Sequence, residues 1–386
     1  MSMVSDVVIV GGGISGTAAA YALALAGTSV TLIEKGDLAS MASGWTLGGV
    51  RQSGRHPSEL PLAQAAVRRW MTLSEELEAD LEYRQEGNLR LARTPEEVEV
   101  IAGLVRDQRS HGLDLEFLRD PATVRGVAPA LSSTVLAASY CPTDGHANPT
   151  ATVQAFAAAA RRRGAVIRTG TAATGISTQG GRVMGVQTSA GPVASDVVVL
   201  AAGVHTDRLC QMVGLDLPLR VAHVAVVQTV PLPPIMRQVV GVANGDFAGR
   251  QEVGGRMRMT GDAFAWRWPE GPLGGDDVQP PAWAVRAALD RAVAILPALA
   301  EARIARVWGG LIDVTPDALP VIERSPEIEG LVIAAGFSGH GFCLGPITGQ
   351  LICELITKEG PSLPLAAFRR ARFAGPVGAR RAELHG

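Results

Sequence analysis

Lysine is the scarcest charged residue of this chain. Lys35 and Lys358 are its only two lysines, and arginine supplies the remaining positive charge. Cysteine is also rare, and no two of the four cysteines form a C-x-x-C pair. Such cysteines fit a reducing cytoplasm and do not by themselves assemble an iron–sulfur or zinc site.

Long apolar runs and a surplus of charge are absent as well. The longest apolar runs, such as residues 197–202, are far shorter than the roughly 20 residues of a membrane span. The formal net charge of −2 leaves no basic face for nucleic acid and no acidic tail. No basic region precedes the N-terminal apolar run, so a secretory signal is not expected. We expect a cytoplasmic protein whose 386 residues suffice for two intergrown domains.

A glycine-rich turn near the N-terminus is the strongest positive signal. Residues 6–10 predict a buried parallel strand, and Gly11, Gly13 and Gly16 follow it at the G-x-G-x-x-G spacing. Residues 17–26 then form a strong helix pattern. In such a unit the first glycine permits the tight turn, the second lets a diphosphate approach, and the third lets helix and strand pack closely. The helix N-terminus presents free N–H groups to the diphosphate.

An acidic residue at the expected distance completes this unit. A second apolar strand, residues 29–33, ends in Glu34, which lies 18 residues after Gly16. An acid at this place binds a ribose 2′-hydroxyl and disfavours a 2′-phosphate. The sequence therefore predicts a dinucleotide site; the alternative is a structural βαβ unit that binds nothing.

The rest of the chain alternates between helical and strand patterns. Helices are expected over residues 61–82, 95–111, 151–163, 280–296 and 347–356. Strands are expected as a pair over residues 84–92, in a mostly antiparallel region over 221–268, and as buried strands at 196–200 and 330–335. Because the last two strands end in glycine and return to the nucleotide sheet, we predict an α/β fold with α+β insertions. The predicted nucleotide domain comprises 1–82, 142–214 and 318–386, and the substrate domain comprises 83–141 and 215–317.

Three separate matches give the chain a resemblance to a known superfamily. They are residues 11–34 with the Ser43-Gly44 loop, residues 201–203 after a buried strand, and the set 308–311, 315–317, 320–322 and 336–342. In these the chain resembles the flavoproteins of the D-amino-acid oxidase, glycine oxidase and sarcosine oxidase superfamily. It looks most like the FAD-binding β subunits of dye-linked opine, proline or D-hydroxyproline dehydrogenases. The resemblance implies a Rossmann-type FAD domain of the glutathione-reductase-like kind, an inserted antiparallel substrate domain, and oxidation of a C–N bond in an amino acid or N-substituted amino acid.

The resemblance also implies which residues hold FAD. They are the diphosphate turn Gly11, Gly13, Ile14, Ser15 and Gly16, the ribose pair Glu34 and Lys35, the flavin-side loop Ser43, Leu47, Gly48 and Gly49, Ala173 facing the adenine, Gly203, and the closing loop Gly336, Ser338, Gly339, His340, Gly341 and Phe342. The helix after the closing loop would stabilise the negative charge that reduction leaves on the flavin. Some relatives bond FAD to a cysteine; Gly310 stands at that place, so non-covalent FAD is expected.

The substrate anchor departs from the pattern of the relatives. Ile312 stands where glycine-oxidase relatives carry an arginine for the substrate carboxylate, and Cys343 stands where single-subunit sarcosine oxidases carry a lysine. Arginine is the best bidentate partner of a carboxylate. Arg51 is the first candidate anchor and Arg258 the second, although each has the alternative of an ordinary surface arginine. His340 is a third candidate catalytic residue; its alternative is local hydrogen bonding within its loop.

The expected reaction is hydride transfer from the substrate to flavin N5, giving an imine that hydrolyses. Reaction with oxygen depends on a lysine beside the flavin in several relatives, and neither lysine of this chain is expected there. A dehydrogenase is therefore favoured over an oxidase, with electrons passing to a dye or to partner subunits that carry an iron–sulfur centre or a second flavin. The rival interpretations are an FAD-dependent 2-hydroxy-acid dehydrogenase and a non-catalytic FAD-binding relay subunit. An NAD-dependent dehydrogenase would leave the closing loop without a purpose.

Overall fold

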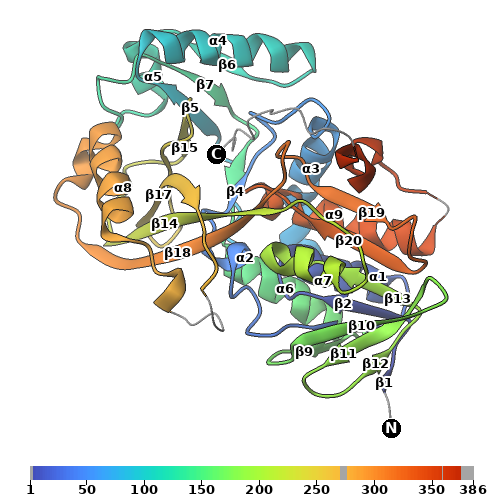
Figure 1. Ribbon diagram of the computed structural model, residues 1–386. Coiled ribbons are helices and arrows are strands. Elements are labelled where there is room, and N and C mark those ends of the chain that lie inside the picture. The colour runs from blue at the N-terminus through green and yellow to red at the C-terminus, as the bar shows by residue number, and fades with distance from the viewer. Residues whose placement is uncertain (1–2, 270–275, 359, 375–386) are drawn as a thin grey trace.

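A computed structural model describes residues 3–269, 276–358 and 360–374. The glycine turn lies on a six-stranded sheet of order β19-β20-β13-β2-β3-β9 (Figure 1). Neighbouring strands are parallel except for β19 and β20. The strands are β2 (Val7–Val10), β3 (Val30–Ile33), β9 (Val166–Arg168), β13 (Val197–Leu200), β19 (Val321–Arg324) and β20 (Leu331–Ala335).

Both faces of this sheet are covered, which explains the unbroken apolar run of β2. Val7 and Ile9 face a core shared with α1 (Ile14–Leu25), α3 (Leu60–Leu77), α6 (Pro149–Arg162) and α9 (Gly341–Thr357). Val8 and Val10 face the opposite core, which β10 (Ala173–Gln179) and β11 (Arg182–Thr188) help to form. Strands β11, β12 (Val193–Ala194) and β1 (Met3–Val4) complete that four-stranded layer. Full burial of each such side chain contributes roughly 1.5–3 kcal/mol.

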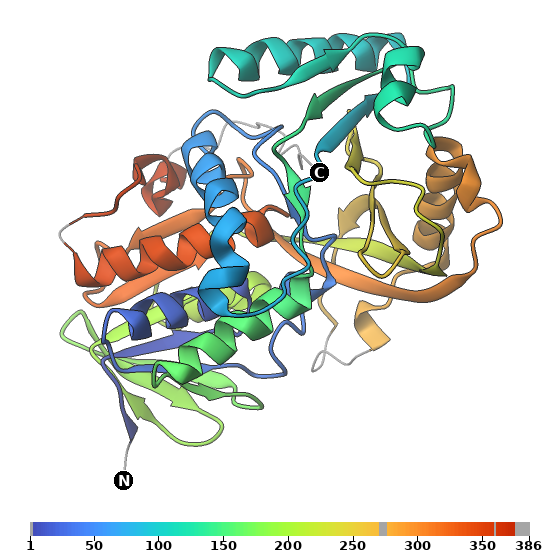
Figure 2. The same ribbon diagram turned by 180° about the vertical axis from the view of Figure 1, so that it is seen from behind.

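Two glycines of α9 let it lie directly against α1. A Cβ on Gly345 would lie 2.3 Å from Cγ1 of Ile14, and one on Gly349 would lie 2.5 Å from the main-chain carbon of Ala18. From the first contact to the second, the chain moves four residues forward on both helices, so the helices run parallel. Their N-termini therefore lie side by side at one edge of the sheet (Figure 2).

The second domain is built on an eight-stranded sheet of order β18-β14-β17-β16-β15-β5-β7-β6. Its pairs are antiparallel except for β15 with β5. Its strands are β5 (Asn88–Ala92), β6 (Glu116–Leu118), β7 (Ala137–Cys141), β14 (Arg220–Pro231), β15 (Val239–Val242), β16 (Ala248–Gln251), β17 (Arg256–Ala265) and β18 (Ile304–Val314). The remaining helices are α2 (Ala42–Trp45), α4 (Pro95–Ser110), α5 (Pro121–Val127), α7 (Thr206–Gln211) and α8 (Ala282–Ile295).

The structure corrects three element predictions. Helix α3 ends at Leu77, because Glu78 adopts a left-handed conformation with φ of 53°. The strand pair expected over 84–92 is wrong: only β5 forms, and Arg84 instead makes an isolated bridge to His146. Helix α9 begins at Gly341 rather than at residue 347, despite its internal proline. The early start matters because it brings the helix N-terminus next to the glycine loop.

Candidate active site

A large cavity of about 960 Å³ lies where the two sheets meet. Its wall includes the ends of β2, β3 and β13, the N-termini of α1 and α9, and residues of β14, β15, β17 and β18. This volume is at the upper end of the range for ligand pockets. The cavity therefore has room for a large cofactor and a small second ligand.

The glycine turn forms one end of the cavity, and two of its glycines are sterically required. Gly11 has φ of +120°, and a Cβ there would lie 2.2 Å from the carbonyl oxygen of Ala201. A Cβ on Gly16 would lie 2.0 Å from the carbonyl oxygen of Gly11. Helix α1 begins after Gly13, which as a glycine offers no side-chain acceptor; the hydroxyl of Ser43 accepts from the Ile14 N–H at 3.0 Å. Unused N–H groups at this helix N-terminus fit a diphosphate.

A second helix N-terminus, that of α9, faces the same cavity. Its first residue follows His340, which gives it no side-chain cap within the described chain. The loop before it is fixed by Asp313: its carboxylate accepts from the Gly336 N–H at 2.6 Å, and its carbonyl accepts from the Ser338 N–H at 2.9 Å. Burial raises the pKa of Asp313 to about 6. This second set of free donors fits a flavin ring that gains negative charge on reduction.

The predicted ribose residues lie at the end of β3. Glu34 accepts from the Gly12 N–H at 2.7 Å and from the Gly36 N–H at 2.8 Å, which holds its carboxylate at the cavity wall. Lys35 lies 2.7 Å from Nε2 of His205. Burial and then the Lys35 charge lower the pKa of His205 to about 4, so the neutral ring accepts from the ammonium group. His205 is a wall residue that the sequence reasoning missed.

Most residues predicted to hold FAD lie together in the cavity wall. They are Gly11, Gly13, Ile14, Ser15, Glu34, Lys35, Ser43, Leu47, Gly49, Ala173, Gly203, Ser338, Gly339, His340, Gly341 and Phe342. Gly16, Gly48 and Gly336 lie behind the described wall instead. A Cβ on Gly48 would lie 2.4 Å from the carbonyl oxygen of Ala147, and one on Gly336 would lie 2.3 Å from Cγ2 of Thr315. These three glycines are thus required by close packing around the site.

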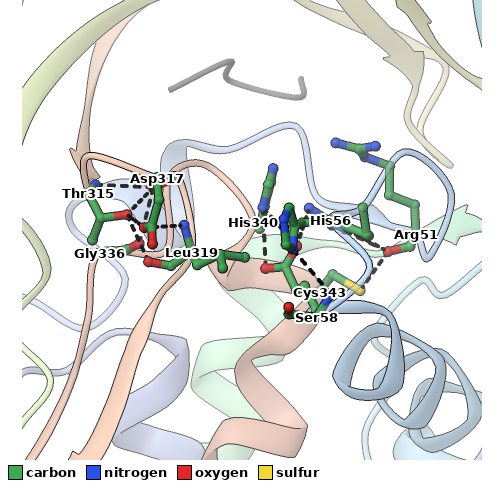
Figure 3. Close-up of polar contacts among 12 residues, drawn as sticks. Arg51, His56, Ser58, Thr315, Asp317, Leu319, Gly336, His340 and Cys343 are labelled. Carbon is green, nitrogen blue, oxygen red and sulfur yellow. Dashed lines mark hydrogen bonds and ion pairs between the residues drawn. The ribbon is translucent and has the colours of Figure 1, made fainter. Parts of the chain in front are cut away.

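Arg51 lies in the wall between the start of α9 and the eight-stranded sheet. The residue is 9% exposed, and Nη1 donates to the carbonyl of Ser53 at 2.7 Å. Figure 3 shows its main-chain oxygen beside Cys343, whose Sγ donates to it at 3.4 Å. The same oxygen accepts from Arg55 at 3.3 Å. The flavin-side loop is therefore tied to α9 by main-chain contacts that do not depend on the Arg51 side chain.

Arg258, the second candidate anchor, lies outside the cavity wall as far as the described residues define it. Its Nε atom is 2.7 Å from Glu252, and its Nη1 donates to the carbonyl of Thr46 at 2.7 Å. The structure thus places this side chain against the flavin-side loop at Thr46, outside the described cavity wall.

His340 lies in the wall as predicted and has a buried acidic partner. Its Nδ1 is 3.2 Å from Glu59, which in turn is 3.9 Å from Arg55. Burial opposes ionisation of Glu59, but His340 and Arg55 together bring its pKa down to about 2. Burial and Arg55 lower the pKa of His340 to about 4. At neutral pH we assign a neutral ring whose Nδ1–H donates to the ionised carboxylate.

The sequence reasoning also missed Asn88 and Arg90, which line the cavity from β5. A signal for them was present in the strand. Leu89 and Leu91 alternate with them and pack into the core of the second domain. Because side chains alternate across a strand, the two polar residues had to share the other face.

Acid should destabilise the flavin-side loop through His146. Its Nδ1 accepts from Nη1 of Arg250 at 3.0 Å, and Arg250 also donates to the carbonyl of Leu47. Burial and the Arg250 charge lower the pKa of His146 to about 3. The folded state therefore binds fewer protons than the unfolded state below about pH 6.5, so stability falls as the pH falls.

We expect His146 to account for a loss of about 2 kcal/mol in unfolding free energy between pH 6.5 and 4.5. Urea unfolding at several pH values measures this loss. His146→Asn keeps an acceptor but cannot gain a proton, so its pH profile should be flatter over this range. Equal slopes for the two proteins would contradict the assignment.

The fold and the cavity define a class of protein. A Rossmann-type sheet with two free helix N-termini over one cavity is typical of a dinucleotide-dependent oxidoreductase whose cofactor gains negative charge. The chain matches the sequence profile of the DAO family, FAD dependent oxidoreductases, over residues 6–355. It belongs to this family, and FAD is its cofactor. The glycine turn, the Glu34 carboxylate and the start of α9 fit that cofactor.

Relatives cover almost the whole chain. Sarcosine oxidase subunit beta from Rhizobium meliloti (strain 1021) is 29% identical over 380 residues, covering 95% of this chain and 88% of the relative. The crystal structure of L-proline dehydrogenase from P. horikoshii is 30% identical with a TM-score of 0.88, covering 97% and 99%. That of glycine oxidase from Geobacillus kaustophilus is 27% identical with a TM-score of 0.90, covering 97% and 100%. The predicted fold class and resemblance are thereby confirmed. In the ranges that the structure describes, no helix combines the length and apolarity needed to cross a membrane.

Proposed function

We propose that this chain oxidises the C–N bond of an amino acid or N-substituted amino acid. The observation that carries the proposal is the buried guanidinium of Arg51 in the cavity, next to the start of α9. A buried arginine facing a cavity fits a carboxylate held by two parallel hydrogen bonds. The relatives named for sarcosine, glycine and proline support a substrate of this kind.

The residues of the chain position the substrate and exclude water. FAD held at this site would supply the two-electron acceptor, taking both electrons from the substrate as one hydride. Arg51 holds the carboxylate, and the apolar side chains of Val226, Val240 and Ile312 line the same cavity. Placement and an unprotonated amine suffice for this chemistry, so the chain needs no nucleophile. His340, neutral and fixed by Glu59, orders the wall beside the substrate.

We further propose that the chain is a dehydrogenase that passes its electrons to a dye or to partner subunits. Cys343 occupies the place of the lysine in oxygen-using relatives, and it is fully buried. Lys35 lies at the ribose end, and Lys358 donates to Glu354 after the end of α9. Both lysines thus lie away from Cys343. A subunit arrangement is supported by the relative that is named a sarcosine oxidase subunit beta.

An anaerobic screen of flavin bleaching tests the reaction. The chain is expressed alone with FAD and mixed with D-amino acids, proline derivatives, N-methyl amino acids and opines, and with 2-hydroxy acids as a comparison. We expect bleaching by at least one amine at a rate that saturates with concentration. Bleaching by hydroxy acids alone supports the 2-hydroxy-acid rival, and no bleaching at all supports the relay subunit.

Reoxidation of the bleached enzyme tests the acceptor. We expect air to reoxidise the flavin at a rate far below the turnover rate with an artificial dye. The reason is that Cys343 stands at the place of the lysine in oxygen-using relatives, and both lysines of the chain lie away from it. Stopped-flow absorbance compares the two rates directly. Reoxidation in air at the turnover rate would instead identify an oxidase.

A further inference from the structure

Asp313 is a buried carboxylate in the wall of the cofactor cavity. It is the last residue but one of β18 and is 6% exposed, and its Oδ2 accepts from the Gly336 N–H at 2.6 Å. Glu97 of the same wall, in contrast, pairs with Arg93 at 2.9 Å. Asp313 thus differs from Glu97 in being held by a main-chain N–H group and not by a cation.

Several titratable groups lie on the elements packed against β18 and the turn that follows it. Among the described residues they are Arg220 and His223 of β14, His205 and Asp277 of the two 3-10 turns Gly203–His205 and Asp276–Val278, Asp317 with its partner Arg372, and His340 before α9. The pKa of Asp313 depends instead on burial and on main-chain N–H groups. A charge placed in the cavity is therefore the main charge to which this carboxyl group responds.

The same residue belongs to the loop that presents the N-terminus of α9 to the cavity. Its carbonyl accepts from the Ser338 N–H at 2.9 Å, and the Ser338 hydroxyl accepts from the Thr315 N–H at 3.3 Å. Figure 3 shows Thr315 bonded in turn to Asp317 and Leu319. The Asp313 carboxylate and the N–H groups at the start of α9 are thus held at one cavity by a single hydrogen-bonded unit.

The two parts of this unit act on a negative charge in opposite directions. Helix N–H groups stabilise the charge that reduction leaves on a flavin, whereas an ionised carboxylate repels it. The same negative charge raises the pKa of a neighbouring carboxyl group. Burial already raises the pKa of Asp313 to about 6, so a further rise brings its protonation to neutral pH.

We propose that Asp313 takes up one proton from solvent when the bound FAD is reduced and releases it when the FAD is oxidised again. Two electrons and one proton enter the flavin, as in the transfer of one hydride. The second proton forms an O–H bond on the Asp313 carboxylate, and no bond breaks there. Asp313 is thus a positioning residue that acts on the flavin through its charge. The inference goes beyond the proposed function, because it holds for any two-electron reductant.

The pH dependence of the flavin midpoint potential tests the inference. In a two-electron couple, each proton taken up lowers the potential by about 30 mV per pH unit. We expect the wild-type slope to exceed this value and to approach about 60 mV per pH unit above about pH 6, where Asp313 is ionised in the oxidised protein and protonated in the reduced protein. Spectroelectrochemical titration of the FAD-loaded protein measures the slope. A slope of about 30 mV per pH unit at every pH overturns the inference.

Asp313→Asn keeps an acceptor for the Gly336 N–H but cannot take up the proton. Its slope should fall to about 30 mV per pH unit. Its potential at neutral pH should rise by about 30–60 mV, a 10- to 100-fold change in the reduction equilibrium, because the cavity wall loses a negative charge. Asp290→Asn, which removes a carboxylate 71% exposed on α8, is the matched control and should change neither value. A steep slope in Asp313→Asn overturns the inference.

Thr315→Val separates the charge of Asp313 from the geometry of its loop. This variant removes the hydroxyl that donates to the Leu319 carbonyl at 2.8 Å, while the Asp313 carboxylate stays in place. We expect it to keep the steep slope. If it loses that slope as Asp313→Asn does, the geometry of the loop explains the pH dependence and the inference fails.

Infrared difference spectra of the reduced against the oxidised protein detect the proton directly. A band of a protonated carboxyl group should appear on reduction of the wild-type protein and should be missing in Asp313→Asn. The wild-type slope and band decide the matter even where Asp313→Asn does not fold, since the lack of both overturns the inference. Both are measured with a chemical or electrochemical reductant. Failure of every amine to bleach the flavin therefore contradicts the proposed function and leaves this inference standing.

Discussion

Replacing Arg51 with leucine is expected to lower kcat/KM for the amine substrate by roughly 10²- to 10³-fold, because truncating one partner of a buried charge pair costs 2–5 kcal/mol. The FAD content should stay unchanged. The contacts that tie this loop to α9 use the main-chain oxygen of Arg51. This oxygen accepts hydrogen bonds from Cys343 and Arg55, and it is present whatever side chain stands at position 51. Anaerobic single-turnover reduction at several substrate concentrations separates the effect on binding from that on the chemical step.

Two further variants make this result specific. Arg51→Lys keeps the charge but loses the planar fork, so it should recover only part of the lost kcat/KM. Arg286→Leu removes an arginine that is 83% exposed and should leave kcat/KM unchanged. An unchanged KM for Arg51→Leu, or a loss of FAD as large as the loss of activity, would show that Arg51 is not the substrate anchor.

The parts of the fold that the sequence predicted well are those with local signals. The strand–glycine–helix unit ending in Glu34 is specified within residues 7–34, so backbone sterics and one buried strand suffice to recognise it. The start of α9 was missed because Pro346, a residue that usually interrupts a helix, lies inside α9. The strand pair expected over residues 84–92 was wrong because Arg84 bridges to His146, a partner that is remote in the sequence.

Predictions of the site residues also succeeded where the signal was local and failed where it depended on remote contacts. Arg51, the first candidate anchor, lines the cavity, whereas Arg258 contacts Glu252 and Thr46, which no local pattern reveals. Arg90 had a local signal in the alternation of β5, but its approach to Arg51 depends on Gly54. A cluster assembled from a loop and a distant sheet becomes visible only when both domains are in place. The domain boundaries and the non-covalent attachment of FAD stay predictions; release of free FAD on denaturation tests the second.

The second large effect is expected at Gly11. In Gly11→Ala the new Cβ would lie 2.2 Å from the carbonyl oxygen of Ala201, at φ of +120°. That oxygen belongs to main chain just after β13, and the Ala201 N–H donates to the carbonyl of Val10 at 2.9 Å. Overpacking plus backbone strain should cost on the order of 3 kcal/mol or more, and should lower the apparent Tm by roughly 5–10 °C. Because β2 and β13 must separate, the purified variant should also retain little FAD.

Gly27→Ala is the matched control, since it lies at the other end of the same helix. Gly27 also has a positive φ, of +83°, but no described atom lies within 4 Å of an added Cβ. Only the backbone strain of a left-handed alanine remains, about 1 kcal/mol, and FAD should be retained. Absorbance of the flavin per polypeptide and thermal unfolding measure both effects. If the two alanine variants lose FAD equally, general destabilisation explains the result, and the close approach of Gly11 to Ala201 is not what shapes the diphosphate site.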